Sequence, residues 1–143
     1  MKHKLLYFLL SLMILGTACV KSVPPTPVQI PAGTFTGQFR LLYRKTGATA
    51  IDTTQLATIN ISLNDLTKAY AVTGDTSVHA GSFGTYAIAP PYILFTDKTY
   101  PTTGTPTKTH LNGTYEYYYD GSTLQMLAGS DTTNFQYDLK KTN

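Results

Sequence analysis

Residues 111–128 read LNGTYEYYYDGSTLQMLA, and this stretch decides the fold class. Apolar or aromatic side chains recur at alternate positions before Asp120 and again after Gly121, with polar residues between them. A period of two is typical of an antiparallel strand that buries one face. Asp-Gly between two such runs is a strong signal for a β-hairpin, because the glycine supplies the positive φ of a primed turn. The stretch therefore predicts two paired strands joined by Asp120-Gly121.

The same alternation continues along the rest of the chain. Residues 55–63 place aliphatic side chains on one face and threonine, asparagine and serine on the other. Pro90 and Pro91 cannot donate hydrogen bonds to a neighbouring strand, and they therefore predict a turn or bulge. Eight strands are predicted, near residues 35–44, 55–63, 68–74, 82–89, 92–96, 111–120, 124–128 and 134–140.

Eight short strands without a convincing helix predict an all-β domain. Eight antiparallel strands can close into a barrel whose interior holds side chains or one small ligand. Closure also removes the unpaired strand edges that promote aggregation. We therefore expect an eight-stranded antiparallel barrel, and a two-sheet β-sandwich is the alternative.

The first eighteen residues have the features of an export signal. Lys2 and Lys4 precede an apolar run over residues 5–15, and small residues follow before Cys19. As a helix, the run would reach only about 17 Å against a hydrocarbon core of roughly 30 Å. Residues 1–18 are therefore predicted to be a cleaved signal peptide and not a permanent transmembrane anchor.

Residues 15–19, LGTAC, resemble a loosened bacterial lipobox of the Bacteroidetes type. The resemblance implies that Cys19, the only cysteine, is acylated and becomes the N-terminus that holds the protein to a membrane. Ordinary signal-peptidase cleavage before Cys19, which leaves a free thiol, is the alternative. Residues 19–32 carry four prolines and predict a short, semi-extended tether. The domain is expected to cover residues 33–143.

This domain resembles small lipocalin-like lipoproteins of unknown function. The resemblance is carried by GTFTGQF at residues 33–39, LNGTYEY at 111–117 and YDGSTL at 119–124. It implies a lipocalin-like barrel in which a glycine of the first strand lets an aromatic side chain plug the barrel end. Phe35 stands where true lipocalins usually carry tryptophan, and no C-terminal helix is predicted, so the resemblance does not extend to a particular ligand.

Tyrosines are the candidate ligand contacts. The chain has eleven tyrosines and no tryptophan. Tyrosines on one face of the sheet can line a cavity, where they hold an amphipathic ligand by stacking and by hydroxyl hydrogen bonds. The alternative is that they fill a core without tryptophan. The five candidates are Tyr43, Tyr115, Tyr117, Tyr119 and Tyr137.

Residues 97–110 lack alternation, and they predict either a lid at one end of the barrel or a variable surface loop. His79, His110 and Asp97 have no metal-ligand spacing, so neither a metal site nor a cofactor is predicted. No G-x-S-x-G sequence is present, and the protein is expected not to be an enzyme.

The charge balance argues against a nucleic-acid partner. Eleven basic residues face eight acidic ones, and removal of Lys2 and Lys4 with the signal would leave nine. Such a near-neutral chain does not attract phosphate backbones.

The sequence thus predicts an envelope-anchored lipoprotein that binds a small apolar or amphipathic ligand. The alternative is an accessory module of an outer-membrane protein complex with a filled barrel. Val20, and not aspartate, follows Cys19, which favours the outer membrane, and the absence of nearby acidic residues favours a periplasm-facing orientation.

Overall fold

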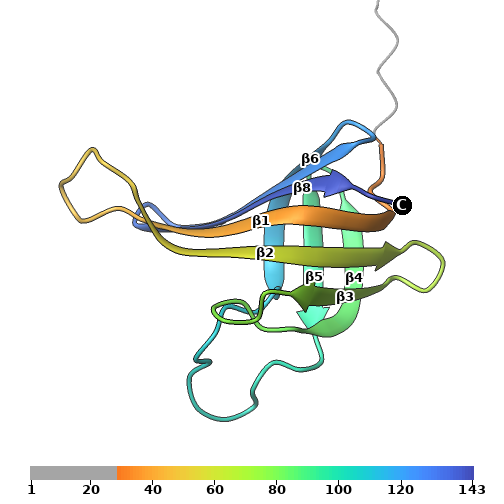
Figure 1. Cartoon of the computed structure of the whole chain (residues 1–143), viewed down its shortest axis with the longest axis horizontal. Coiled ribbons are helices and arrows are strands. Elements are labelled where there is room, and N and C mark those ends of the chain that lie inside the picture. Colours follow the sequence, from red (N-terminus) through yellow and green to blue (C-terminus); the bar gives the residue numbers. More distant parts are fainter. Residues whose placement is uncertain (1–28) are drawn as a thin grey trace, which may run out of the picture.

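The computed structural model describes residues 29–143, and the predicted signal peptide, Cys19 and residues 20–28 of the predicted tether lie outside them. Each strand pairs antiparallel with the next, and the last pairs with the first, so the sheet closes into a barrel (Figure 1). The eight-stranded antiparallel barrel is confirmed, and the sandwich alternative is wrong. The strands are β1 (Gly33–Tyr43), β2 (Asp52–Asn64), β3 (Ala69–Gly74), β4 (Phe83–Ala89), β5 (Tyr92–Asp97), β6 (Gly113–Tyr119), β7 (Thr123–Gly129) and β8 (Thr133–Lys141).

No helix of membrane-spanning length and hydropathy occurs in the part of the chain that the structure describes.

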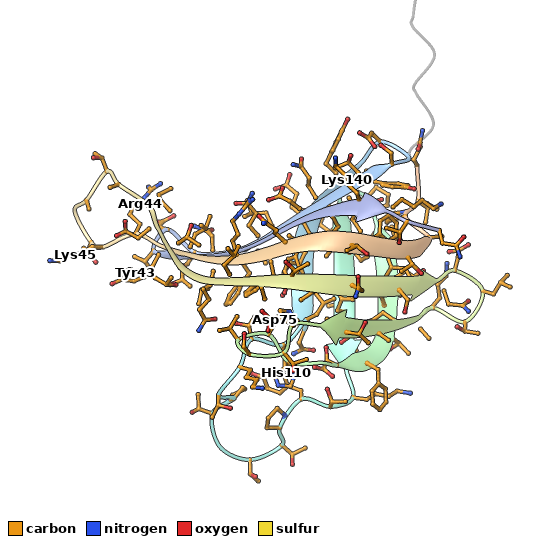
Figure 2. The ribbon with its side chains drawn as sticks, viewed as in Figure 1. Tyr43, Arg44, Lys45, Asp75, His110 and Lys140 are labelled. Atoms are coloured by element: carbon orange, nitrogen blue, oxygen red, sulfur yellow. The ribbon has the colours of Figure 1, made fainter. Side chains whose placement is uncertain are left out.

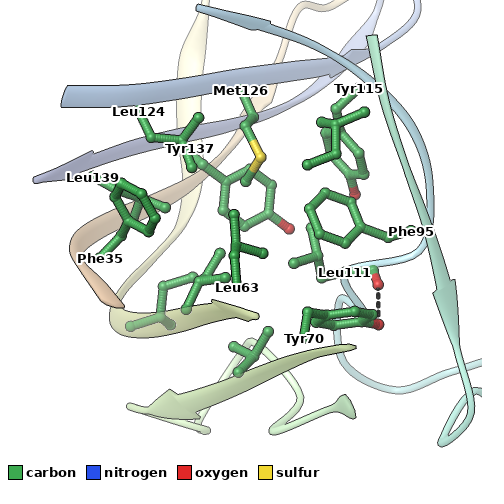
Figure 3. Packing of buried hydrophobic residues seen from close by; sticks show 14 of the residues in the cluster. Phe35, Leu63, Tyr70, Phe95, Leu111, Tyr115, Leu124, Met126, Tyr137 and Leu139 are labelled. Carbon is green, nitrogen blue, oxygen red and sulfur yellow. Dashed lines mark hydrogen bonds between the residues drawn. The ribbon is translucent and has the colours of Figure 1, made fainter. Parts of the chain in front are cut away.

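Aromatic and aliphatic side chains fill the barrel interior (Figure 3). Phe39 packs against Tyr137 with ring centroids 5.1 Å apart, and Phe95 packs edge to face with Tyr115 at 5.8 Å. The hydroxyl of Tyr70 donates a 2.6 Å hydrogen bond to the carbonyl of Leu111. The inward residues of each strand therefore meet in one core, as the alternation predicts.

The seam between β1 and β8 closes the barrel, and Gly37 lies in its middle, opposite Leu139. A Cβ atom on Gly37 would lie 2.1 Å from the carbonyl oxygen of Asp138 and 2.8 Å from the Cα of Leu139. Glycine inside a strand is typical of such close backbone approaches. On the outer surface, the guanidinium of Arg40 pairs with the Asp138 carboxylate across the same seam.

The two ends of the barrel differ in the length of their connections. In an up-and-down barrel, alternate connections lie at opposite ends. One end carries residues 65–68, 90–91 and 120–122, which are short turns. The other end carries the longer connections, at residues 44–51, 75–82 and 98–112, together with the short turn at 130–132.

The predicted hairpin between β6 and β7 is confirmed, with a turn displaced by one residue. Tyr119 pairs with Leu124, and the N–H of Asp120 donates to the carbonyl of Thr123 at 3.3 Å, so Gly121 and Ser122 are the central residues. Gly121 has the expected positive φ, at 97°. The Asp120 carboxylate accepts the N–H groups of Ser122 and Thr123, and this side-chain cap draws Asp120 to the edge of the turn.

The start of β6 is also displaced from its predicted position. Leu111 and Asn112 belong to the preceding connection, and the strand begins at Gly113, whose φ is +95°. The side-chain oxygen of Asn112 accepts the backbone N–H of Asp97 at 3.0 Å. Leu111 is nevertheless fully buried. The connection between β5 and β6 is therefore anchored to the barrel at both ends.

Candidate functional site

A cleft of about 450 Å³ opens at the end of the barrel that carries the longer connections. One wall comes from the end of β1 and the starts of β2 and β8, and the other comes from residues 106–112 of the β5–β6 connection. The residues that line it are Leu41, Gln55, Tyr100, Pro106, Thr107, Lys108, Thr109, His110, Asn112, Tyr115, Thr133 and Phe135.

Apolar side chains form one part of this cleft. Leu41 and Phe135 are opposite each other on the paired strands β1 and β8, and both pack against the buried core. Tyr115 lies beside them on the lining, with its ring almost fully buried. A ligand in the cleft would therefore meet aliphatic and aromatic surface continuous with the core.

A histidine held by a buried carboxylate forms the polar part. The side chain of Asp97 has no exposed surface, and its Oδ2 lies 2.7 Å from Nδ1 of His110. The other oxygen, Oδ1, accepts the N–H of Thr99 at 2.7 Å and the Thr99 hydroxyl at 2.6 Å. The edge of the Tyr100 ring packs against the imidazole at 5.2 Å between centroids. These contacts fix the orientation of His110 on the cleft wall.

The hydrogen bond to Asp97 also decides the tautomer of His110. A carboxylate only accepts hydrogen bonds, so Nδ1 carries a proton and its N–H donates a hydrogen bond to Asp97. Nε2 has no hydrogen-bond partner within residues 29–143. Nε2 is therefore the polar atom of the Asp97–His110 pair that can form a hydrogen bond with a bound molecule.

A second histidine is buried beneath the cleft and has a different environment. His79 is fully buried, with Nδ1 at 2.8 Å from the carbonyl of Ala80 and Nε2 at 2.9 Å from the hydroxyl of Tyr137. Nδ1 therefore donates to the carbonyl, and Nε2 accepts the tyrosine hydroxyl proton. Burial lowers the pKa of His79 to about 4, so the ring is neutral near pH 7.

Burial also keeps the neighbouring tyrosines protonated. It raises the pKa of Tyr137 well above its ordinary value, and it raises the pKa of Tyr115. The rings of Tyr115 and Tyr137 pack edge to face with centroids 5.5 Å apart. The ring of Tyr115 on the cleft wall is thus backed by Tyr137, whose hydroxyl is bonded to the neutral ring of His79.

The structure separates the five tyrosines that the sequence groups together. Tyr115 lines the cleft, and Tyr137 lies directly behind it. Tyr117 and Tyr119 lie further along β6, toward the opposite end of the barrel, and the Tyr119 hydroxyl donates to the carbonyl of Gly121. Tyr43 lies on the hairpin that projects beyond the barrel and is 43% exposed (Figure 2).

The chain matches no protein-family model, curated protein or solved structure.

The Asp97–His110 pair is the part of the site that sequence reasoning missed. From the sequence, these two residues suggest only metal ligation, together with His79. Within residues 29–143 no three His, Cys, Asp or Glu side chains gather as metal ligands would. A usable signal was the position of the pair: Asp97 ends one strand and His110 shortly precedes the next, so hairpin pairing brings them to the same barrel end.

Proposed function

We propose that this protein is an envelope-anchored lipoprotein that binds a small apolar or amphipathic ligand in the cleft at the end of its barrel. The observation that carries the proposal is the cleft itself. Its volume of about 450 Å³ falls within the range of small-molecule sites, roughly 300–1,000 Å³. Its lining combines apolar surface from Leu41, Phe135 and Tyr115 with the oriented imidazole of His110.

The filled interior limits where the ligand can lie. Phe39, Phe95 and Tyr137 are almost fully buried and occupy the barrel below the cleft. A ligand would therefore rest at the barrel mouth, between the strand ends and the β5–β6 connection.

The position of the described N-terminus supports a tethered arrangement. A Cβ atom on Gly121 would lie 2.7 Å from the side-chain oxygen of Gln29, so the chain enters at the end with the short turns. The cleft lies at the opposite end. A lipid on Cys19, joined to the barrel through residues 20–32, would therefore leave the cleft facing away from the attachment point.

Replacement of Phe135 by serine tests ligand binding in the cleft. We expect the purified protein to bind decanol, and we expect the replacement to weaken that binding about tenfold or more, because it removes an aromatic contact with the alkyl chain. Titration calorimetry with decanol measures the affinity, and circular dichroism verifies that the variant is folded. Phe83→Ser is the matched control, since Phe83 is 57% exposed and does not line the cleft. Equal affinities for decanol in both variants would contradict the assignment.

Replacement of Cys19 by serine tests the anchor. Because the thiol is the expected acylation site, the variant should leave the membrane fraction or stall before cleavage, and the barrel, which contains no cysteine, should fold normally. Fractionation and mass spectrometry of the N-terminus report the result. Normal processing and unchanged membrane residence of the serine variant would rule out lipidation.

Protease treatment of intact cells tests the proposed outer-membrane, periplasm-facing position, which requires that the domain is protected.

An accessory role in an envelope protein complex is the second candidate function. The outer surface carries exposed apolar side chains on neighbouring strands, among them Tyr92, Tyr118 and Leu127. A second cleft, of about 350 Å³, lies over β6, β7 and β8 and includes Tyr118 and Leu127. These features suit a protein contact. Failure of the wild-type protein to bind decanol or any other ten-carbon amphiphile would favour this role over ligand binding.

A further inference from the structure

The charged side chains around the cleft are distributed unevenly. Lys108 and His110 both line it, whereas none of its lining residues is acidic. The Asp97 carboxylate lies behind His110 with no exposed side-chain surface, so a ligand cannot reach it. Asp75 lies close enough to feel the charge of Lys108 but does not line the cleft, and its carboxylate accepts the N–H of Ser77.

The buried carboxylate of Asp97 determines which nitrogen of the His110 ring is left for a ligand. With Nδ1–H donated to Asp97, the ring presents Nε2 as its remaining polar atom. Nε2 can therefore take up a proton and then donate a charge-assisted hydrogen bond.

From this arrangement we infer that the cleft selects amphipathic ligands with an acidic head group, a carboxylate in particular. The head group binds Nε2 of His110, and the apolar chain lies against Leu41 and Phe135. The inference rests on the proposed ligand-binding function and adds the chemical class of the ligand.

Proton transfer accounts for the preference for acids. A neutral carboxylic acid that meets neutral His110 transfers its proton to Nε2, so that its O–H bond breaks and an N–H bond forms. The carboxylate then accepts a hydrogen bond from the imidazolium, whose charge is balanced on its other side by Asp97. A carboxylate that meets protonated His110 gives the same complex. An alcohol of the same chain length forms only a neutral hydrogen bond with Nε2, and an ammonium head group is disfavoured by the positive charge of Lys108 on the cleft wall.

Lys108 provides a permanent positive charge on the same wall. Its ammonium donates to the carbonyl of Thr76 at 2.5 Å, and this contact ties residue 108 to the β3–β4 connection. An ammonium has three N–H donors, so two remain for a ligand. Because Lys108 is exposed to water, its contribution should be smaller than that of His110.

Titrations with decanoate, decanol and decylamine test the inference on the purified full-length protein. These molecules share one alkyl chain and differ in the head group. We expect decanoate to bind about tenfold more tightly than decanol, and decylamine to bind more weakly than either. Equal binding of decanoate and decanol, or preferred binding of decylamine, would overturn the acidic-ligand assignment and leave the proposed function standing. Absence of binding by all three would overturn both.

The variant His110→Asn isolates the contact at Nε2. An asparagine amide nitrogen can take the place of Nδ1 and keep the hydrogen bond to Asp97, while no atom replaces Nε2. The preference for decanoate over decanol should largely disappear, because decanoate loses a charge-assisted hydrogen bond while decanol loses only a neutral one, and circular dichroism verifies that the variant is folded. Lys108→Gln should reduce the decanoate preference by a smaller factor. Retention of the full preference in His110→Asn would exclude His110 as the head-group ligand.

Discussion

Replacement of Gly37 by alanine should destabilise the barrel by about 3 kcal/mol or more. The added methyl group would lie 2.1 Å from the carbonyl oxygen of Asp138, which belongs to the backbone of β8 and cannot rotate away. Relief requires that β1 and β8 separate, and these strands form the seam that closes the barrel. Urea unfolding followed by circular dichroism measures the change in the free energy of unfolding.

Gly81→Ala is the matched control for this prediction. Gly81 lies in the β3–β4 connection, and its added Cβ atom would have ordinary contacts, 3.4 Å from Thr76 Cγ2 and 3.6 Å from the carbonyl oxygen of Val72. Its effect should stay within about 0.5 kcal/mol. Comparable stabilities of the two alanine variants would mean that β1 and β8 are not closely apposed at Gly37.

The strands and the faces that they bury follow from local alternation. The hairpin of β6 and β7 shows this, because its side chains alternate between core and surface as their sequence does. Strand ends are less predictable, because side chains near them compete with the neighbouring strand for backbone N–H groups. The carboxylate of Asp120 captures backbone N–H groups in one turn, and the amide of Asn112 captures the N–H of Asp97 before β6.

The alternation of apolar and polar residues does not tell how far along the barrel a side chain lies. Two residues further along a strand point in the same direction but lie about 7 Å away. Tyr115 and Tyr119 therefore share a face and lie near opposite ends of the barrel, while Tyr43 passes beyond it. A list of inward tyrosines thus contains one residue that lines the cleft, together with residues that fill the core or lie outside it.

One wall of the cleft comes from a segment in which apolar and polar residues do not alternate. Residues 98–112 have no secondary-structure pattern, so their path over the barrel end depends on long-range contacts such as the hydrogen bond from Thr109 to the carbonyl of Val78. Asp97 and His110 approach each other through the pairing of β5 with β6. Sequence spacing indicates such a pair only after the strand order is known.

The buried histidine His79 gives the stability of the fold a pH dependence of its own. In the folded protein its pKa is lowered from 6.5 to about 4, chiefly because burial disfavours the charged ring. Above pH 6.5 the ring is neutral in both the folded and the unfolded chain, so its protonation does not affect stability. Below pH 6.5 the unfolded chain binds a proton that the folded chain does not bind, and the unfolded state gains stability.

The free energy of unfolding should therefore fall by up to about 3 kcal/mol as the pH is lowered from 6.5 to 4. Urea unfolding at several pH values measures this loss, and His79→Gln identifies its source. Glutamine does not titrate, and its amide oxygen can accept the hydroxyl proton of Tyr137 in place of Nε2. The variant should be less stable than the wild type near pH 7, but its stability should decline less between pH 6.5 and 4.

Because the carboxylates titrate in both proteins, their contribution cancels in the difference between the two curves. Parallel curves over this range would show that His79 is not the buried neutral group that the hydrogen bonds to Ala80 and Tyr137 imply.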